Sequence, residues 1–310
     1  MIYDNFGRPV LNLRISVTQR CNLNCPYCHR EGETPSSTGS FKREMTTEEI
    51  IQLTKIAVGL GISKAKLTGG EPLLRKDILQ IVEGMANLQG LKDLSMTTNG
   101  VHLGFLAKDL KQKGLIRVNI SFPSLDAKTY RNLMDGELRE VLKGVKTAVD
   151  VGLHPVKLNM LILKGINDNE IEKMLSFAEH SGTILQLIEL EPVNISQDYY
   201  EQHHFNLDAT QKQLKEQALE VRTRKNMQNR KVYFLPKTKV EIVKPIENTQ
   251  FCRRCTRLRM TSDGKLKPCL MRNDNLVDIL GPLRNGANDK ELESLFIEAC
   301  KRRKPYWNSN

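Results

Sequence analysis

The chain has 310 residues, of which 39% are hydrophobic and 27% are charged, and its formal net charge is +11. This is the composition of a folded globular protein, and no apolar run approaches the ~18–20 residues that a membrane span needs. The N-terminus has neither the basic start nor the apolar stretch of a signal peptide. The chain has seven cysteines, an odd number, and six of them lie in two clusters, which argues against a disulfide framework and predicts a reducing cytoplasm. The surplus of Lys and Arg favours an anionic partner, either phosphates or nucleic acid.

Strand and helix patterns alternate through the first two thirds of the chain. Strands are expected at 11–17, 64–68, 92–97, 115–122, 156–163 and 184–190, each followed by a helical pattern. The first helix begins with a capping box, Thr46-Thr47-Glu48-Glu49, after an irregular loop at 31–40. Six such units require parallel strands with right-handed crossovers. A barrel opened at six units or a doubly wound sheet satisfies this pattern, whereas a closed barrel needs eight.

Three cysteines, Cys21, Cys25 and Cys28, lie in the short loop after the first strand. Thiolates select iron–sulfur clusters, zinc or copper(I). Three ligands leave one metal position open for chemistry, because the adjacent His29 is badly placed to share a tetrahedron with Cys28. Cysteines this dense in a loop are rarely core residues, so the spacing favours a metal site.

Unusual residues recur just past the ends of the predicted strands. They are the Cys21–Cys28 loop, Gly69-Gly70-Glu71-Pro72, Thr97-Thr98-Asn99, Ser121 and residues 189–191. The carboxyl ends of parallel strands form the edge where ligands bind in α/β folds. We therefore expect these segments to share one site, where the two glycines would let a ligand approach the backbone.

After Pro192 the alternation ends and a second cysteine group appears. A helix is expected at 208–223 and a hairpin from 232–235 and 239–243, followed by Cys252 and Cys255. A second hairpin, with strands at 258–261 and 265–270, would bring Cys269 back beside this pair. Cys300 lies on the apolar stripe of a terminal helix and is expected in the core. The thiols of Cys252, Cys255 and Cys269 thus lack a fourth ligand, as the first three do, and this predicts a second site with an open metal position.

Basic side chains surround the second cysteine group. Arg257 and Arg259 are two residues apart on an expected strand and so share a face. Planar guanidiniums suit phosphate oxygens, and two on one face suit a polyphosphate. The alternative is a solvated strand face.

The cysteine spacing resembles the CxxxCxxC signature of radical S-adenosylmethionine enzymes. The two incomplete triplets, Gly69-Gly70-Glu71-Pro72, Asn119-Ile120-Ser121, the 164–168 segment and the Cys-x-x-Cys-Thr-Arg-Leu-Arg run further resemble the GTP 3′,8-cyclase family of molybdenum cofactor biosynthesis. The resemblance implies two [4Fe–4S] clusters, on Cys21, Cys25 and Cys28 and on Cys252, Cys255 and Cys269. It implies that S-adenosylmethionine contacts Tyr27, Gly70 and Ser121, and that Glu191 stands where many members have a methionine near the adenosyl group. GTP would be held by Arg14, Lys66, Thr97, Lys157, Arg257 and Arg259, with its guanine at the second cluster.

The resemblance implies a radical cyclisation of GTP, in which a 5′-deoxyadenosyl radical takes a hydrogen atom from C3′. We therefore expect an α/β fold with a partial (β/α)6, TIM-like barrel over residues 1–205. A C-terminal subdomain over 206–310 would carry the second cluster and bind substrate. Many members end in two glycines that reach the active site, whereas this chain ends Tyr306-Trp307-Asn308-Ser309-Asn310.

Expected partners are GTP, a flavodoxin- or ferredoxin-like electron donor and, downstream, a pterin-forming enzyme; a homodimer is left open. No membrane and no nucleic-acid partner are expected. Two alternatives remain: a radical S-adenosylmethionine enzyme that modifies a peptide, and a zinc-stabilised RNA-binding protein. Against the second, only 5% of residues are aromatic, few for base stacking.

Overall fold

The structure is a computed structural model that describes residues 1–33 and 44–307. Most of the expected 31–40 loop and the last three residues of the chain therefore lie outside the described residues. No helix within the described ranges is long and apolar enough to cross a membrane.

Alternating strands and helices form the first part of the chain. The strands are β1 (Asn12–Ser16), β2 (Lys64–Thr68), β3 (Asp93–Thr98), β4 (Arg117–Ser121), β5 (Val156–Ile162) and β6 (Ile184–Glu189). The helices are α1 (Thr47–Gly59), α2 (Ile78–Ala86), α3 (Leu103–Gln112), α4 (Ala127–Met134), α5 (Leu138–Asp150) and α6 (Ile171–Ser181), with 3-10 turns η1 (Arg30–Gly32), η3 (Pro72–Leu74) and η4 (Asp168–Glu170). These strands pair in parallel in chain order, and the predicted capping box of Thr46 and Glu49 begins α1.

The rest of the chain extends both edges of the same sheet. Its elements are α7 (Gln197–His203), α8 (Asp208–Gln217), β7 (Glu220–Arg224), β8 (Arg230–Phe234), β9 (Lys239–Val243), α9 (Thr249–Arg253), β10 (Arg257–Met260), β11 (Lys265–Lys267), β12 (Val277–Asp278), α10 (Leu280–Arg284) and α11 (Asp289–Lys301). Strand β10 adds in parallel to β1 and β9 adds in parallel to β6, so the described sheet runs β12-β11-β10-β1-β2-β3-β4-β5-β6-β9-β8-β7.

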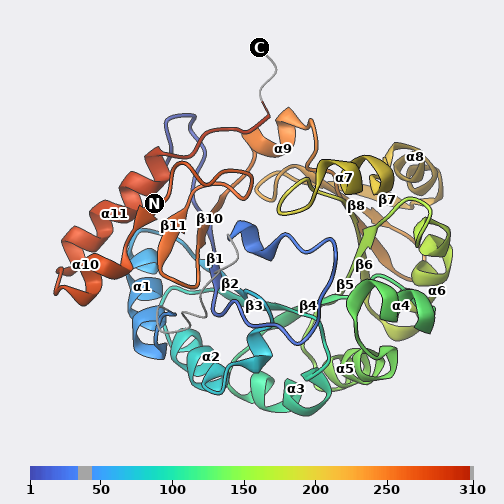
Figure 1. Ribbon diagram of the computed structural model, residues 1–310, viewed down its shortest axis with the longest axis horizontal. Helices are drawn as coiled ribbons and strands as arrows, with labels where there is room; N and C mark the ends of the chain where they lie inside the picture. The colour runs from blue at the N-terminus through green and yellow to red at the C-terminus, as the bar shows by residue number, and fades with distance from the viewer. Residues whose placement is uncertain (34–43, 308–310) are drawn as a thin grey trace.

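The sheet curves into an open ring with helices outside it (Figure 1). Within the described residues, the first and last strands of the sheet, β12 and β7, are not paired with each other, so the barrel is partial, as predicted. Figure 1 also shows the dark blue segment after β1 inside the ring. Alternation along β1 explains the two sides: Leu13 and Ile15 are buried in the hydrophobic core, while Arg14 lies on the inner face.

The predicted C-terminal end of one helix is wrong. We expected helix through residue 223, but α8 ends at Gln217, and Glu220–Arg224 is strand β7. This segment pairs antiparallel with β8, Val221 opposite Tyr233. The hydrogen bonds of that ladder override a local pattern that fits a helix equally well.

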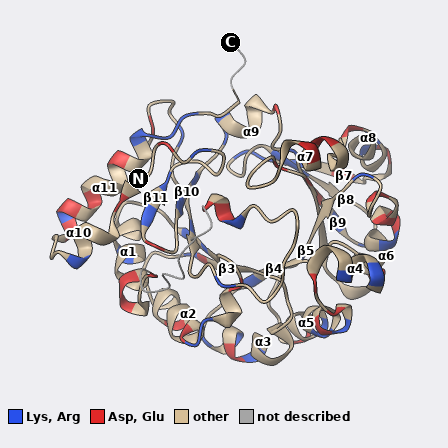
Figure 2. Ribbon diagram, in the orientation of Figure 1, with Lys and Arg blue, Asp and Glu red and all other residues tan. Residues whose placement is uncertain are grey.

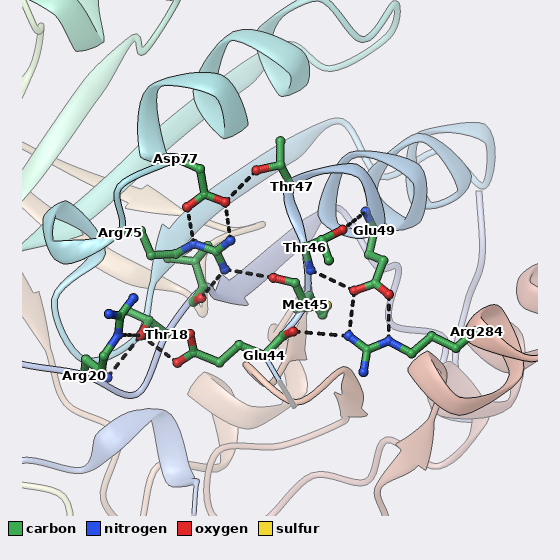
Figure 3. A network of polar contacts seen from close by, with 11 residues as sticks. Thr18, Arg20, Glu44, Met45, Thr46, Thr47, Glu49, Arg75, Asp77 and Arg284 are labelled. Atoms are coloured by element: carbon green, nitrogen blue, oxygen red, sulfur yellow. Dashed lines mark hydrogen bonds and ion pairs between the residues drawn. The ribbon is translucent and has the colours of Figure 1, made fainter. Parts of the chain in front are cut away.

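A polar network fixes the chain just before the first cysteine (Figure 3). The buried guanidinium of Arg75 donates to the carbonyls of Val17 (2.7 Å) and Met45 (2.9 Å) and pairs with Asp77 (2.5 Å). Asp77 in turn accepts a hydrogen bond from Thr47 at the start of α1 (2.6 Å). The end of β1 is thus tied to two helices before the cysteine loop begins.

Candidate active site

A cavity of about 340 Å³ opens inside the ring of strands. Every site residue expected from the sequence lines it: the six clustered cysteines and Arg14, Tyr27, Lys66, Gly70, Thr97, Ser121, Lys157, Glu191, Arg257 and Arg259. The expectation that segments far apart in sequence share one site is therefore confirmed in position. Their individual roles stay predictions.

The first cysteine triplet enters the cavity from the loop after β1. Cys21 and Cys28 are exposed and Cys25 is partly buried. Burial, together with the neighbouring Cys28 and Cys21 thiols, raises the pKa of the Cys25 thiol to about 12. The three sulfur atoms are thus close enough to interact electrostatically. These cysteines are therefore expected to ionise to thiolates only when a bound metal compensates the negative charge.

Tyr27 and Met134 meet beside this triplet. The Tyr27 hydroxyl contacts the Met134 sulfur at 2.9 Å, and the Cys25 sulfur lies 3.6 Å from the same Met134 sulfur. Met134 ends α4 and is 1% exposed. Sequence reasoning missed this methionine, because a buried methionine at a helix end carries no local signal of a site.

The two glycines after β2 pack against the protein's own backbone. A Cβ on Gly69 would lie 2.3 Å from the Thr18 carbonyl oxygen, and one on Gly70 would lie 2.2 Å from that of Arg20. The amide of Gly70 donates to Thr18 and that of Glu71 donates to Arg20, both at 2.7 Å. The close approach expected for a ligand is therefore made here by the segment that leads into Cys21.

Glu71 is a buried carboxyl group beside the first triplet. Burial raises its pKa to about 7, although the amides of Asn99 and Leu73 and the Thr98 hydroxyl donate to it. Its charge also raises the pKa of Cys21, after the larger effect of burial. The first triplet thus has a titratable acid next to it.

The second triplet reaches the cavity from α9 and from the β10–β11 hairpin. The expected hairpin is formed, with β10 and β11 antiparallel, but β11 ends at Lys267 instead of residue 270. Cys269 follows the strand and lies near Cys252 and Cys255. Burial alone would raise the pKa of Cys255, but the guanidiniums of Arg303 and Arg257 lower it below the ordinary value. The backbone amide of Trp307 lies 3.5 Å from the Cys252 sulfur.

The donor sets fit two iron–sulfur clusters. Each triplet offers three free thiols, and a [4Fe–4S] cluster takes one thiolate per iron, so its ligands do not converge on one atom. Among the described residues, no three His, Cys, Asp or Glu side chains are grouped closely enough to hold a single ion. Three thiols leave one iron of each cluster for another ligand.

Basic side chains in register line the wall between the triplets. Arg14 on β1 is the register partner of Arg259 on β10 and of Lys66 on β2, so the three project from the same face. Figure 2 shows the blue of Lys and Arg on β10 and β11. Burial and the neighbouring guanidiniums of Arg230, Arg14 and Arg259 lower the pKa of Arg257 well below its usual value. This wall suits an anion of several charges.

Glu31 bridges two of these cations and was missed by the sequence analysis. One carboxylate oxygen accepts from Arg14 (2.6 Å) and Thr68 (2.8 Å), and the other accepts from Arg259. Burial would raise the pKa of Glu31, but Arg14 and Arg259 hold it well below the usual range. An acid in the loop after the cysteines gave no sign that it folds back onto β1 and β10.

A second carboxylate, Glu241 on β9, holds the other cations of the cavity. Its buried side chain pairs with the ammonium of Lys157, with Arg224 (3.0 Å) and with Arg230 (3.6 Å). These ion pairs hold the Glu241 pKa well below normal, although its burial acts the other way. Lys157, expected to bind GTP, is thus already paired with Glu241, and sequence reasoning missed this partner because β9 lies 84 residues away in sequence.

The remaining expected residues occupy the wall between these groups. Lys66 donates to Asn119 (2.6 Å), which in turn donates to Asn159 (3.1 Å). Thr97, Ser121 and Glu191 line the cavity from β3, β4 and the segment after β6. Burial lowers the pKa of Lys66 well below normal, as do Arg117, Arg14 and other cations nearby.

Two family models match almost the whole chain. The Radical SAM superfamily matches residues 15–178, and Molybdenum Cofactor Synthesis C matches residues 183–309. The "Probable GTP 3′,8-cyclase" of Methanothermobacter thermautotrophicus is 46% identical over 308 residues, covering 99% of each chain. That of Thermococcus kodakarensis is 49% identical over 315 residues, covering 99% of this chain and 100% of the relative.

Among solved structures, SuiB of Streptococcus suis bound to S-adenosylmethionine shares the fold. The TM-score is 0.61 at 17% identity, and the match covers 84% of this chain but only 60% of SuiB. At this identity the likeness concerns the fold alone.

Proposed function

This chain belongs to the GTP 3′,8-cyclases within the radical S-adenosylmethionine superfamily, and we propose that it converts GTP to (8S)-3′,8-cyclo-7,8-dihydroguanosine 5′-triphosphate, the first step of molybdopterin biosynthesis. The observation that carries the proposal is that both cysteine triplets and a row of cations line one cavity. A cavity with a metal site at either side and cations between them suits a substrate with a base at one end and phosphates at the other.

The cysteines of each triplet would hold one [4Fe–4S] cluster. The first cluster together with S-adenosylmethionine supplies, when bound, the one-electron chemistry that starts the reaction. Tyr27, Gly70, Ser121 and Glu191 are proposed to contact S-adenosylmethionine, and their positions around the first triplet and on the cavity wall are compatible with this.

The protein's own contribution is to bind, orient and exclude water. Arg257 is proposed as a principal phosphate ligand, because no carboxylate within the described ranges pairs with it and other cations surround it. Arg14, Lys66 and Arg259 extend the same wall, while Thr97 and Lys157 are proposed to contact the nucleoside. A substrate held at several points inside this cavity reacts in one geometry and is shielded from bulk water.

The division of the chain at residues 205 and 206 remains a proposal. The sheet is continuous across this boundary, since β9 and β10 join β6 and β1. We propose that the two parts act together: residues 1–205 position the first triplet, and residues 206–310 position the second.

The partners of the chain are also proposals. They are a flavodoxin- or ferredoxin-like electron donor, which is consistent with the +11 net charge, a downstream pterin-forming enzyme, and a second copy of the chain. Seven free thiols favour a reducing cytoplasm.

Hydrogen transfer tests the proposed function directly. Anaerobically reconstituted protein would be incubated with S-adenosylmethionine, a reductant and GTP deuterated at C3′. We expect 5′-deoxyadenosine heavier by one mass unit and a GTP isomer separable by chromatography. GTP deuterated at C2′ is the control and should transfer nothing. Unlabelled 5′-deoxyadenosine with unchanged GTP would contradict the proposal and favour another substrate, such as a peptide.

A further inference from the structure

The turn that carries Glu31 has an unusual backbone. Arg30 and Glu31 both have positive φ angles, 46° and 53°, a conformation that residues other than glycine rarely adopt. Such strain persists only where the surrounding structure enforces it, and it gathers at ligand sites and switches. The enforcing contacts here are those between the Glu31 carboxylate and Arg14, Arg259 and Thr68.

The cations of the wall fall into two groups. Arg14 and Arg259 share the single carboxylate of Glu31, while Arg257 and Lys66 have no carboxylate partner among the described residues. The buried Nε of Arg14 also has no acceptor in the described part of the chain, although its Nη2 is bonded to Glu31. One carboxylate therefore satisfies only part of a wall that can donate to several anionic oxygens.

We propose that Glu31 is an internal competitor of the substrate triphosphate, holding Arg14 and Arg259 until phosphate oxygens displace it. The proposal rests on the proposed function, because it assigns the arginine wall to the phosphates of GTP. Arg257 and Lys66 receive the first phosphate oxygens. Repulsion between these oxygens and the single carboxylate then favours release of Glu31, and its release also relieves the strained turn.

The position of the turn gives the displacement a consequence at the first triplet. Glu31 lies three residues after Cys28, and the Gly32 amide donates to the His29 carbonyl at 2.7 Å. Movement of Glu31 therefore changes the backbone that follows the third cysteine. Triphosphate binding at one side of the cavity is in this way coupled to the loop that binds the first cluster.

A permanent structural role for Glu31 predicts the opposite effect of substitution. If Glu31 only fixed Arg14 and Arg259 in place for GTP, its loss would weaken GTP binding. If it competes with the phosphates, its neutral analogue would bind GTP more tightly. The sign of the change in Kd therefore decides between the two.

The test is equilibrium dialysis of GTP and guanosine with the anaerobically reconstituted protein, in the absence of S-adenosylmethionine. We expect Glu31→Gln to lower the Kd for GTP about tenfold and to leave guanosine binding unchanged. Glu191→Gln is the matched control: Glu191 lines the cavity and acts on Arg14 through space. It should tighten GTP binding less than Glu31→Gln does. An unchanged or raised Kd for GTP in Glu31→Gln, or an equal gain in both variants, would overturn the proposal.

Hydrogen exchange of the wild-type protein keeps the proposal testable should Glu31→Gln fail to fold. The amides of Glu31, Gly32 and Glu33 are each bonded within this turn, to His29 Nδ1, the His29 carbonyl and the Arg30 carbonyl. We expect GTP to speed their exchange and guanosine to leave it unchanged. Slower or unchanged exchange with GTP would refute displacement. A wild-type protein that binds no GTP would instead refute the proposed function.

Discussion

The two cysteine triplets line the same cavity but differ in the charged side chains that surround them. Around the first, burial, the neighbouring thiols and the acids Glu71 and Glu31 raise the cysteine pKa values. At the second, burial raises the pKa values of Cys252 and Cys269, but cations lower that of Cys255. An acidic side favours a cationic ligand such as a sulfonium, whereas a basic side favours phosphates. The difference supports S-adenosylmethionine at the first triplet and GTP toward the second.

Removal of the cysteines should separate the two triplets most sharply. We expect about eight irons per chain after reconstitution and about four when either triplet is disrupted. Replacing Cys21, Cys25 or Cys28 with Ala should abolish S-adenosylmethionine cleavage. Replacing Cys252, Cys255 or Cys269 should stop cyclisation while some uncoupled cleavage remains. Iron analysis and quantification of 5′-deoxyadenosine check both, and a wild type that binds only about four irons would contradict the two-cluster assignment.

Each triplet has its own buried arginine anchor, and the two anchors can be removed separately. Arg303, 1% exposed, donates to the carbonyls of Cys255 and Arg8, while Arg75 donates to Val17 ahead of Cys21. Each buried carbonyl left without a donor costs about 1–3 kcal/mol. Arg303→Met should therefore lose iron from the second site and keep S-adenosylmethionine cleavage, whereas Arg75→Met should lose cleavage. Equal iron loss from both sites in either variant would show that the anchors are not separate.

The fold and the two cysteine sites could be predicted from the sequence because both depend on local spacing. Period-two strands, glycine turns and the two cysteine groups are readable without tertiary contacts. Even the face shared by Arg257 and Arg259 followed from their two-residue spacing and is confirmed by β10. The prediction failed for β7, whose strand conformation depends on pairing with β8.

The acids that organise the cavity could not be predicted in the same way. Glu31 and Glu241 meet their cations across sequence separations of up to 228 and 84 residues, respectively. Nothing beside them in sequence distinguishes them from solvated acids. Sequence reasoning therefore found the basic wall but not the carboxylates that already neutralise part of it, and it assigned Lys157 to GTP without its Glu241 partner.

Arg257 is the arginine whose removal should most cleanly weaken the basic side. A charge-assisted hydrogen bond contributes about 1.5–3 kcal/mol, so Arg257→Ala should weaken GTP binding roughly ten- to a hundredfold. Arg257→Lys should restore it only in part, because lysine lacks the planar pair of donors. Guanosine should bind wild type and variant equally, and equal losses for GTP and guanosine would show that Arg257 does not bind the phosphates.

Arg259→Ala should in addition lower the thermal stability, since it leaves Glu31 with one cation fewer.

Glu71 should make the stability of the acidic side depend on pH. Its pKa is about 7 in the folded protein, mainly because of burial, against about 4.5 for an exposed carboxyl. A raised folded pKa gives a contribution that is complete below pH ~4.5 and is lost as the pH rises through ~7. The free energy of unfolding should thus fall by roughly 2 kcal/mol between pH 5 and pH 8 from this group alone. Glu71→Gln should flatten this dependence in thermal melts, and an unchanged slope would locate the titration elsewhere.

The seventh thiol offers the smallest effect and tests whether the second site is complete with three cysteines. Cys300 is 1% exposed on α11 and packs in the hydrophobic core with Leu292 and Phe296. Cys300→Ala should therefore keep the full iron content and activity and lower the free energy of unfolding by about 1 kcal/mol through a small cavity. Cys269→Ala is the matched control, since the same atom is removed from a thiol that interacts with Cys255 and Cys252. If Cys300→Ala lost four irons as Cys269→Ala should, the fourth iron of the second site would have a protein ligand, and no position there would remain for GTP.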